Sequence, residues 1–179
     1  DYPAGAPFSW MPQGLLPPGP RDNVTIGEAA TSATNNLGRA LGNGSGTQAA
    51  VGLSQGTLAL DQMQVRLAND PNAPSRDKLT FTTIGDPTGT SAFGKSILAS
   101  IFQPGEYIPL IDYTMPKKVE SQYNTNRVVA AYDGLADAPD RWENPFAAAN
   151  AIAGSTIVHT PAAFTSPDIV PPQNIKTEV

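Results

Sequence analysis

The chain of 179 residues is long enough for one domain, and its 40% apolar content can supply a hydrophobic core. Its 11 basic and 16 acidic residues give a net charge of −5, which argues against a nucleic-acid-binding protein, because that class carries basic clusters. No apolar run approaches the roughly 18–20 residues of a membrane-spanning helix. The absence of cysteine excludes disulfides, thiolate-bound metals and a thiol nucleophile, and the single histidine excludes any site that needs two.

Residues 1–22 hold six prolines and are predicted to be coil. Large apolar side chains stand between these prolines: Phe8, Trp10, Met11, Leu15 and Leu16. A free tail would not carry so many apolar groups, so we expect this segment to lie over an apolar surface. The chain begins at Asp1 without a recognisable leader, as expected of a processed or excised segment.

The first predicted helix follows, over residues 26–41. Thr25 and Glu28 have the spacing of a capping box, in which the two side chains satisfy free backbone amides of the first turn. Apolar residues then recur on one helical face: Ile26, Ala29, Ala30, Ala33, Leu37, Ala40 and Leu41. Three glycines between positions 42 and 46 end the helix.

A strand, a helix and a second strand are predicted next. The apolar run at 49–51 is expected to be a buried strand, and residues 58–67 fit a helix. Pro71 stops that helix, because proline cannot continue one and disfavours helix in the residue before it. Residues 79–84 have the β-branched and aromatic composition of a strand.

The second half of the chain has weaker signals. Residues 107–111 could form a strand despite Pro109, and residues 128–132 are predicted to be a buried strand. A short helix is expected over 145–153, with proline in its first turn and glycine after it. The alternation of strands and helices predicts an α/β fold with a largely parallel sheet.

The first motif with chemical meaning is Gly52-x-Ser54-x-Gly56, between a predicted strand and a predicted helix. This spacing is typical of a sharp strand-to-helix turn that exposes a serine hydroxyl at its apex, with glycines where side chains would collide. The backbone amide of Gln55, at the start of the helix, could then donate to an oxyanion. Ser54 is therefore the candidate nucleophile.

A second motif, residues 89–96, matches the phosphate-binding loop G-x-x-x-x-G-K-[ST] of nucleotide-binding proteins. Its setting fits that class poorly, because residues 86–88 separate it from the preceding strand, whereas a phosphate-binding loop follows its strand closely. A metal-binding aspartate after a later strand would have to be Asp112 or Asp133, and few residues remain after Ser96 for the rest of such a sheet.

The order serine, aspartate, histidine along the chain is that of α/β-hydrolases, and His159 is the one base available. The orienting acid is expected on the loop after a late strand, where Asp133 and Asp137 both stand. We favour Asp137, because it lies within the loop rather than at the strand's end, and keep Asp133 as the alternative acid. Asp61 and Asp140 are interpreted as solvated surface charges.

These segments together resemble the PE-PPE domain, a cutinase-like serine hydrolase family of mycobacteria and their relatives. The resemblance covers most of the chain, in segments 51–56, 67–68, 78–81, 84–87, 132–139, 144–145, 150–154 and 158–159. Its most specific part is the Tyr-Asp-Gly-x-Ala-Asp segment, followed by an Asn/Ala-rich helix and a histidine. In that family a loop rich in glycine and proline follows the strand after the elbow helix, which would account for residues 85–102 without a nucleotide.

The resemblance implies an α/β-hydrolase fold of the cutinase-like kind, with a mainly parallel central sheet and no metal or other cofactor. The family's first strand and its glycine-rich oxyanion segment have no counterpart here, so we expect the sheet to lack its first strand. We expect one hydrolase domain over residues 1–165, incomplete at its N-terminus, and a proline-rich tail over 166–179.

The resemblance further implies a serine esterase or acyltransferase that acts, through an acyl-enzyme intermediate, on lipid esters of the cell envelope such as acylglycerols or trehalose glycolipids. Ser54 would be the nucleophile, His159 the general acid and base, Asp137 the orienting acid and Gln55 an oxyanion donor. The apolar segment 1–22 would line an acyl-binding surface or cover the core.

Such a protein would be secreted, periplasmic or attached to the cell envelope. Its partners would be a lipid ester or glycolipid and other envelope proteins, with no nucleic acid and no transmembrane segment. Two alternatives from other classes stay open. One is a catalytically silent hydrolase-like subunit that serves in envelope binding or assembly. The other, less favoured, is a P-loop nucleotide-binding protein.

Overall fold

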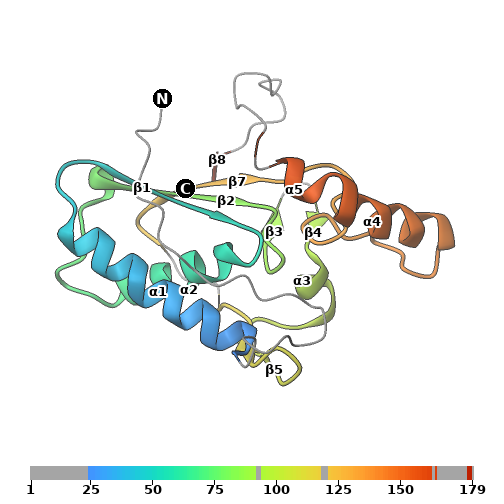
Figure 1. Ribbon diagram of the computed structural model, residues 1–179, viewed down its shortest axis with the longest axis horizontal. Helices are drawn as coiled ribbons and strands as arrows, with labels where there is room; N and C mark the ends of the chain where they lie inside the picture. Colours follow the sequence, from blue (N-terminus) through green and yellow to red (C-terminus); the bar gives the residue numbers. More distant parts are fainter. Residues whose placement is uncertain (1–23, 92–93, 118–120, 163, 165–176, 179) are drawn as a thin grey trace.

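A four-stranded sheet with the order β1-β2-β7-β8 organises the structure (Figure 1). Strands β1 (Gln48–Leu53), β2 (Leu79–Ile84) and β7 (Asn124–Val128) run parallel, and β8 (Thr177–Glu178) pairs antiparallel with β7. The α/β fold with a mainly parallel sheet is therefore confirmed, in the arrangement expected of an α/β-hydrolase-like protein.

The structure is a computed structural model that describes residues 24–91, 94–117, 121–162, 164 and 177–178. The predicted coil at 1–22 lies outside the described residues, and so does most of the predicted tail. The domain boundary at 165 stays a prediction.

Helices α1 (Ile26–Asn43) and α2 (Gly56–Ala68) lie on one side of the sheet (Figure 1). The capping box at the start of α1 is confirmed, with both the Thr25 and the Glu28 side chains bonded to the other's backbone amide. Helix α2 ends at Ala68, just before Asn69-Asp70-Pro71, as the sequence predicts.

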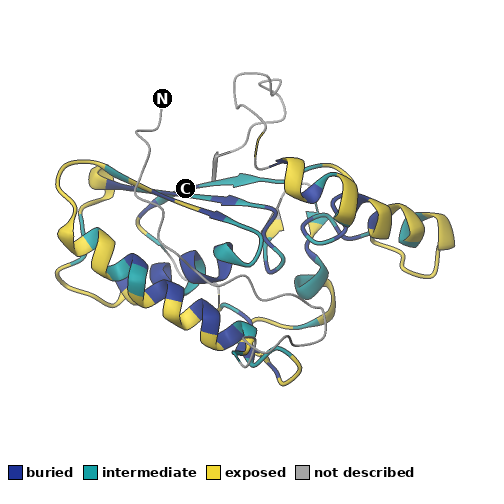
Figure 2. Cartoon of the chain, viewed as in Figure 1, coloured by how far each residue is buried: buried dark blue, intermediate teal, exposed yellow. Residues whose placement is uncertain are grey.

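The main hydrophobic core lies between these two helices and the sheet, where buried residues appear as dark blue on the facing surfaces (Figure 2). It consists of Leu37, Ala50, Leu60, Met63, Leu67, Leu79, Phe81 and Tyr123. Phe81 in β2 is fully buried and meets the ring of Tyr123 edge to face, with centroids 5.6 Å apart. The core thus fixes β1 and β2 side by side, and with them the two turns at their carboxyl ends.

The strand predicted at 128–132 is displaced in the structure. Strand β7 covers Asn124–Val128 and ends where its neighbour β2 ends, because Val128 pairs with Ile84 and the chain turns beyond it. Composition does not predict β7, because most of its residues are polar. The predicted strand at 107–111 is reduced to β5 (Tyr107–Ile108), which forms a small hairpin with β6 (Tyr113–Thr114).

At the carboxyl end of the sheet, helices α4 (Pro145–Ile157) and α5 (His159–Ala162) stand beyond the strands (Figure 1). The side chain of Asn144 caps α4, and a proline occupies its first turn, as predicted. The helix is longer than the predicted 145–153, since it continues through Gly154. The remaining described elements are short: η1 (Arg76–Lys78), β3 (Thr90–Ser91), β4 (Gly94–Lys95) and α3 (Ile97–Ile101).

Within the described part of the chain, no helix combines the length and the apolar character needed to cross a lipid bilayer.

Candidate active site

Ser54 occupies the turn between β1 and α2 and has a backbone φ of 51°, a left-handed conformation that costs free energy for a residue with a side chain. Its amide donates to the carbonyl oxygen of Ile84 at 2.8 Å, which anchors the turn to the end of β2. A Cβ at Gly52 would lie 2.8 Å from the carbonyl oxygen of Gly56, so glycine is required for the turn to close. This geometry is the strand-to-helix elbow that the motif predicts.

Gln55 begins the α2 turn directly after the serine. Its backbone amide makes no hydrogen bond within the described residues, and its side-chain Nε2 is buried without a partner. A free amide at the N-terminal end of a helix beside a nucleophile is suited to bind a developing oxyanion.

The imidazole of His159 pairs with the carboxylate of Asp133. The His159 Nδ1 and Asp133 Oδ2 atoms are 2.6 Å apart, and the two residues are 6% and 0% exposed. The Nε2 atom on the other side of the ring is buried and has no hydrogen-bond partner among the described residues. One ring nitrogen is thus fixed by an acid, while the other remains available to exchange a proton with a substrate or nucleophile.

The preference for Asp137 as the acid that orients the histidine is therefore wrong in this structure, and the alternative, Asp133, takes that position. Asp137 instead accepts a hydrogen bond from the backbone amide of Tyr132 at 2.9 Å. This contact holds Tyr132 at a φ of 66°, at the start of the turn that carries Asp133. The chain turns immediately after β7, so the first acid reaches His159 and the second faces back toward the turn itself.

Gly85 brings the two halves of the site to one corner of the sheet. A Cβ at this position would lie 2.7 Å from Cε1 and 3.0 Å from Nδ1 of His159, so the imidazole packs directly on the glycine backbone. Gly85 follows Ile84, whose carbonyl oxygen holds the amide of Ser54. The serine turn and the histidine therefore both contact the two-residue segment that ends β2.

Helix α4 is seated on the Asp133 turn through two glycines. A Cβ at Gly154 would lie 1.7 Å from the carbonyl oxygen of Tyr132, and one at Gly134 would lie 2.2 Å from that of Ala151. Only residues without side chains allow the helix and the turn to approach this closely. Because α4 ends two residues before His159, this contact sets where the histidine enters the site. The histidine itself begins the short helix α5.

A buried polar network, which the sequence did not predict, supports the strand-to-helix turn at Ser54. Asp86 Oδ1 lies 3.2 Å from the Thr57 hydroxyl and accepts a hydrogen bond from the Thr88 amide at 2.9 Å, and Asp86 Oδ2 pairs with Arg127 at 3.2 Å. The Thr57 hydroxyl also lies 2.7 Å from the carbonyl oxygen of Ser54. The sequence signal was weak, since an aspartate between glycine and proline is usual in any turn.

Asp61 is not the solvated surface charge predicted from the sequence, whereas Asp140 is exposed as expected. Burial, followed by the nearby negative charge of Asp86, raises the pKa of Asp61 from about 3.8 to about 8. The Thr88 hydroxyl lies 2.9 Å from Asp61 Oδ2 and 2.7 Å from Asp86 Oδ1. The Thr88 hydroxyl has one proton and can donate it to only one of these two oxygens. When it donates to Asp86, a protonated Asp61 donates to the Thr88 oxygen, and both contacts are then hydrogen bonds.

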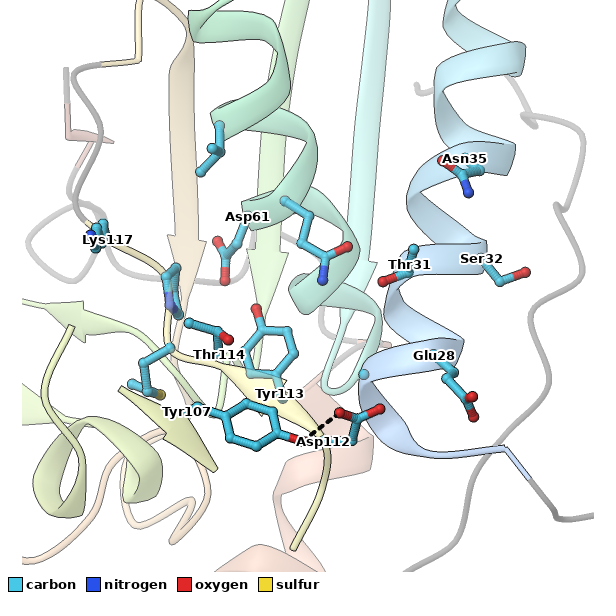
Figure 3. Close-up of a pocket in the computed structure, with 15 residues that line it drawn as sticks. Glu28, Thr31, Ser32, Asn35, Asp61, Tyr107, Asp112, Tyr113, Thr114 and Lys117 are labelled. Atoms are coloured by element: carbon cyan, nitrogen blue, oxygen red, sulfur yellow. Dashed lines mark hydrogen bonds between the residues drawn. The ribbon is translucent and has the colours of Figure 1, made fainter. Parts of the chain in front are cut away.

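A cleft of about 870 Å³ lies between α1, α2 and the β5–β6 hairpin (Figure 3). Asp61 and the buried ring of Tyr113 line its inner wall, and burial followed by the charge of Asp61 raises the pKa of that tyrosine. At its mouth the Tyr107 hydroxyl donates to Asp112 at 2.7 Å. Neither Ser54 nor His159 lines this cleft, so it is separate from the serine–histidine corner.

The described residues of the segment that matches a phosphate-binding loop, 89–91 and 94–96, do not have that geometry. Strands β3 and β4 form an antiparallel hairpin, and the amide of Ser96 donates to the carbonyl oxygen of Gly89, closing the segment on itself. A phosphate-binding loop instead wraps its amides around an anion ahead of a long helix, whereas α3 has five residues. The P-loop alternative is therefore wrong. Across the described ranges, no three His, Asp or Glu side chains gather as a metal site would require.

The fold and the arrangement at the carboxyl edge of the sheet are those of the α/β-hydrolase-like class. The chain belongs to the PE-PPE domain family, whose model matches residues 4–179. No solved structure matches the chain.

Curated relatives come from Mycobacterium tuberculosis. The chain is 61% identical over 182 residues to diacyltrehalose acyltransferase Chp2, covering 100% of this chain and 51% of that protein. It is 43% identical over 169 residues to SL1278 acyltransferase Chp1, covering 94% of this chain and 39% of the relative. A PPE family protein, PPE63, is 40% identical over 117 residues, which are 65% of this chain and 23% of that protein. The chain thus spans about half the length of the first relative, and less of the others.

Proposed function

We propose that the chain carries the acyl-transfer site of a serine acyltransferase that acts on trehalose glycolipids through an acyl-enzyme intermediate. The observation that carries the proposal is the buried His159–Asp133 pair. Its Nε2 has no hydrogen-bond partner within the described ranges, and it lies at the same sheet corner as the strained Ser54 turn. The substrate class comes from the names of the relatives, diacyltrehalose acyltransferase and SL1278 acyltransferase.

In the proposed first step, His159 Nε2 takes the proton of the Ser54 hydroxyl as its oxygen attacks the carbonyl carbon of a lipid ester. The tetrahedral oxyanion accepts a hydrogen bond from the Gln55 amide. Collapse breaks the ester C–O bond, and the protonated His159 gives its proton to the departing alcohol oxygen, which leaves the acyl group on Ser54. Asp133 holds the ring in the tautomer that presents Nε2 as the base and stabilises the cation that forms.

In the second step an acceptor hydroxyl, in place of the first alcohol, loses its proton to His159 and attacks the acyl-enzyme. The ester of the acceptor forms, the Ser54 ester breaks, and the proton returns to the serine. Water as acceptor would give hydrolysis, and a sugar hydroxyl would give transfer. The relatives' names support transfer to a sugar, so we expect water to compete poorly at the acyl-enzyme.

A fluorophosphonate probe tests the nucleophile, because it labels a serine only where a base activates it. We expect labelling of the folded protein that is lost in Ser54→Ala and in His159→Gln. Lys95→Ala, at an exposed position of β4, is the control and should label normally. Absence of labelling in the folded chain would favour the remaining alternative, a catalytically silent subunit for envelope binding or assembly.

A second assay separates transfer from hydrolysis. The protein is incubated with a diacyltrehalose, and the products are resolved as free fatty acid or as trehalose carrying more acyl groups. We expect the more highly acylated trehalose, dependent on Ser54. Free fatty acid alone would assign an esterase instead. Since such substrates are membrane lipids, we propose a location in the cell envelope, where envelope proteins would be the partners.

A further inference from the structure

Helix α4 presents an apolar face to solvent. Phe146, Ile152 and Ile157 are 85%, 65% and 67% exposed. At 100° per residue they share one side of the helix with other exposed positions, and this side, here called the α4 outer face, consists of Phe146, Ala149, Ile152, Ala153, Thr156 and Ile157. The opposite side carries the buried Ala151 and Gly154. An exposed helical face is normally polar, so this reversal indicates an interaction surface.

The α4 outer face carries no charge, because no Asp, Glu, Lys or Arg occurs anywhere in Pro145–Ile157. Six of the ten large apolar side chains that the described structure exposes lie within residues 132–164: Tyr132, Trp142, Phe146, Ile152, Ile157 and Phe164. Exposed surface continues along the whole of this helix, which projects from the body at the carboxyl end of the sheet (Figure 2). The exposed apolar groups are thus concentrated at the active-site end of the molecule.

We propose that the α4 outer face inserts into a lipid surface and holds the serine site at that surface. The inference rests on the proposed function and deepens it, because it states that the enzyme reaches its substrate within a lipid surface. The inner side of α4 contacts the turn of Asp133, through the approach of Gly154 to Tyr132, and its C-terminus leads into His159. A lipid surface bound by α4 is therefore bound next to the histidine and its acid.

A lipid surface fits this face better than a second copy of the chain does. A helix of 13 residues is about 20 Å long, and one face of it about 10 Å wide, which gives a few hundred Å² of contact. A stable protein interface buries roughly 800 Å² on each partner, and it carries about ten hydrogen bonds. A bilayer needs no such area and no paired polar groups, because apolar side chains partition into it singly.

The net charge of −5 indicates which interaction drives the binding to lipid. An acidic chain is not attracted to an anionic membrane, so the binding must come from apolar burial. We expect it to occur on zwitterionic phosphatidylcholine vesicles and to be insensitive to salt, which screens charges but not apolar contact.

The absence of cysteine allows an introduced thiol to report on one position. In the Ser54→Ala background, which removes turnover, Ile152→Cys carries an environment-sensitive fluorophore, and Ala40→Cys on the exposed side of α1 is the matched control. With phosphatidylcholine vesicles the Ile152 label should brighten and shift to the blue, while the Ala40 label should not change. Because the readout needs no catalysis, it can succeed or fail independently of the proposed function.

Flotation with the same vesicles tests the side chains themselves. Phe146→Asp and Ile152→Asp should each weaken partition about tenfold or more, since each removes one buried apolar group and adds a charge. Leu110→Asp is the control, because Leu110 is 92% exposed in the β5–β6 turn, outside the α4 outer face. Circular dichroism should show all three variants folded, as expected for exposed positions.

Three results would overturn the proposal. The Ile152 label could stay unchanged with vesicles while the protein is folded. Leu110→Asp could reduce flotation as much as Ile152→Asp does. Sedimentation could show a dimer of the wild-type chain that Ile152→Asp dissociates, which would assign the α4 outer face to a second copy.

Discussion

Asp133 holds His159 at 2.6 Å across 26 positions of sequence, while Asp137, four residues further along, faces the backbone amide of Tyr132. The two carboxylates therefore have different tasks in one turn. Asp133 orients the His159 ring, which must transfer a proton. Asp137 fixes the backbone of the turn that carries Asp133.

Exchange of each acid for its amide separates these tasks. Asp133→Asn should lower the rate of acylation by about 10³–10⁴-fold, because an amide at this place stabilises neither the required tautomer nor the imidazolium. Asp137→Asn should keep acylation close to normal and lower the free energy of unfolding by about 1 kcal/mol, through a weaker bond to the Tyr132 amide. Fluorophosphonate labelling rates and urea unfolding measure both. Equal loss of acylation in the two variants would contradict the assignment.

Gly85→Ala should impair acylation, because the added methyl group would lie 2.7 Å from Cε1 of His159 and push the imidazole away. A displacement of about 1 Å at such a site is expected to cost on the order of 10²-fold in rate. Gly46→Ala is a matched control, since Gly46 also has a positive φ, of 80°, but has open space around its Cβ position. Both variants should lose about 1 kcal/mol of stability from backbone strain, and only Gly85→Ala should lose labelling. Normal labelling in stable Gly85→Ala would show that the contact does not position the ring.

Gly154→Ala should lift α4 from the Asp133 turn, because its Cβ would stand 1.7 Å from the Tyr132 carbonyl oxygen and cannot be accommodated in place. We expect destabilisation of about 1–3 kcal/mol together with slower acylation, as overpacking moves the acid relative to the histidine. Gly42→Ala in α1 makes the same exchange where nothing lies within 4 Å, and should stabilise the chain by about 0.5–1 kcal/mol. Thermal unfolding and labelling rates give both quantities. The proposed seating would be refuted by Gly154→Ala labelling at the wild-type rate.

The sequence predicted those parts of the site that depend on local backbone. Glycines two residues before and two residues after Ser54 predict the turn, because a side chain at Gly52 would clash with the Gly56 backbone within that turn alone. His159 could be found because no other histidine exists. The acid could not be chosen, since Asp133 and Asp137 differ only in where a turn points them, and that direction depends on the distant contact between Gly154 and Tyr132.

Tertiary pairing explains the remaining differences from the predicted fold. Strand β7 has the sequence Asn-Thr-Asn-Arg-Val, in which only the threonine and the valine favour a strand, and it forms because β2 offers it a pairing edge. The partial burial of Asp61 has the same origin. Its surroundings come from Thr88 and Asp86, 25 or more residues away, and nothing near it in sequence indicates them.

Asp61→Asn should change how stability depends on pH. Because the pKa of Asp61 is raised from about 3.8 to about 8 in the folded chain, the folded state holds a proton that the unfolded state releases between these values. The stability that this proton contributes is complete below pH 3.8 and is lost as pH rises toward 8. Asparagine keeps a donor for the Thr88 hydroxyl and never ionises. The variant should therefore match the wild type below about pH 4, exceed its Tm increasingly from there to about pH 8, and gain nothing further above that pH.

Asp140→Asn is the control for this measurement, since it removes the same formal charge from an exposed position and so reports the general effect of net charge. Thermal unfolding of the three proteins across the pH range gives the comparison directly. An Asp61→Asn advantage that is largest at low pH, or constant across the range, would show that Asp61 is ionised in the folded chain at neutral pH. The Thr88 hydroxyl would then face two carboxylates with one proton, and the network around Asp86 would have to be satisfied by Arg127 instead.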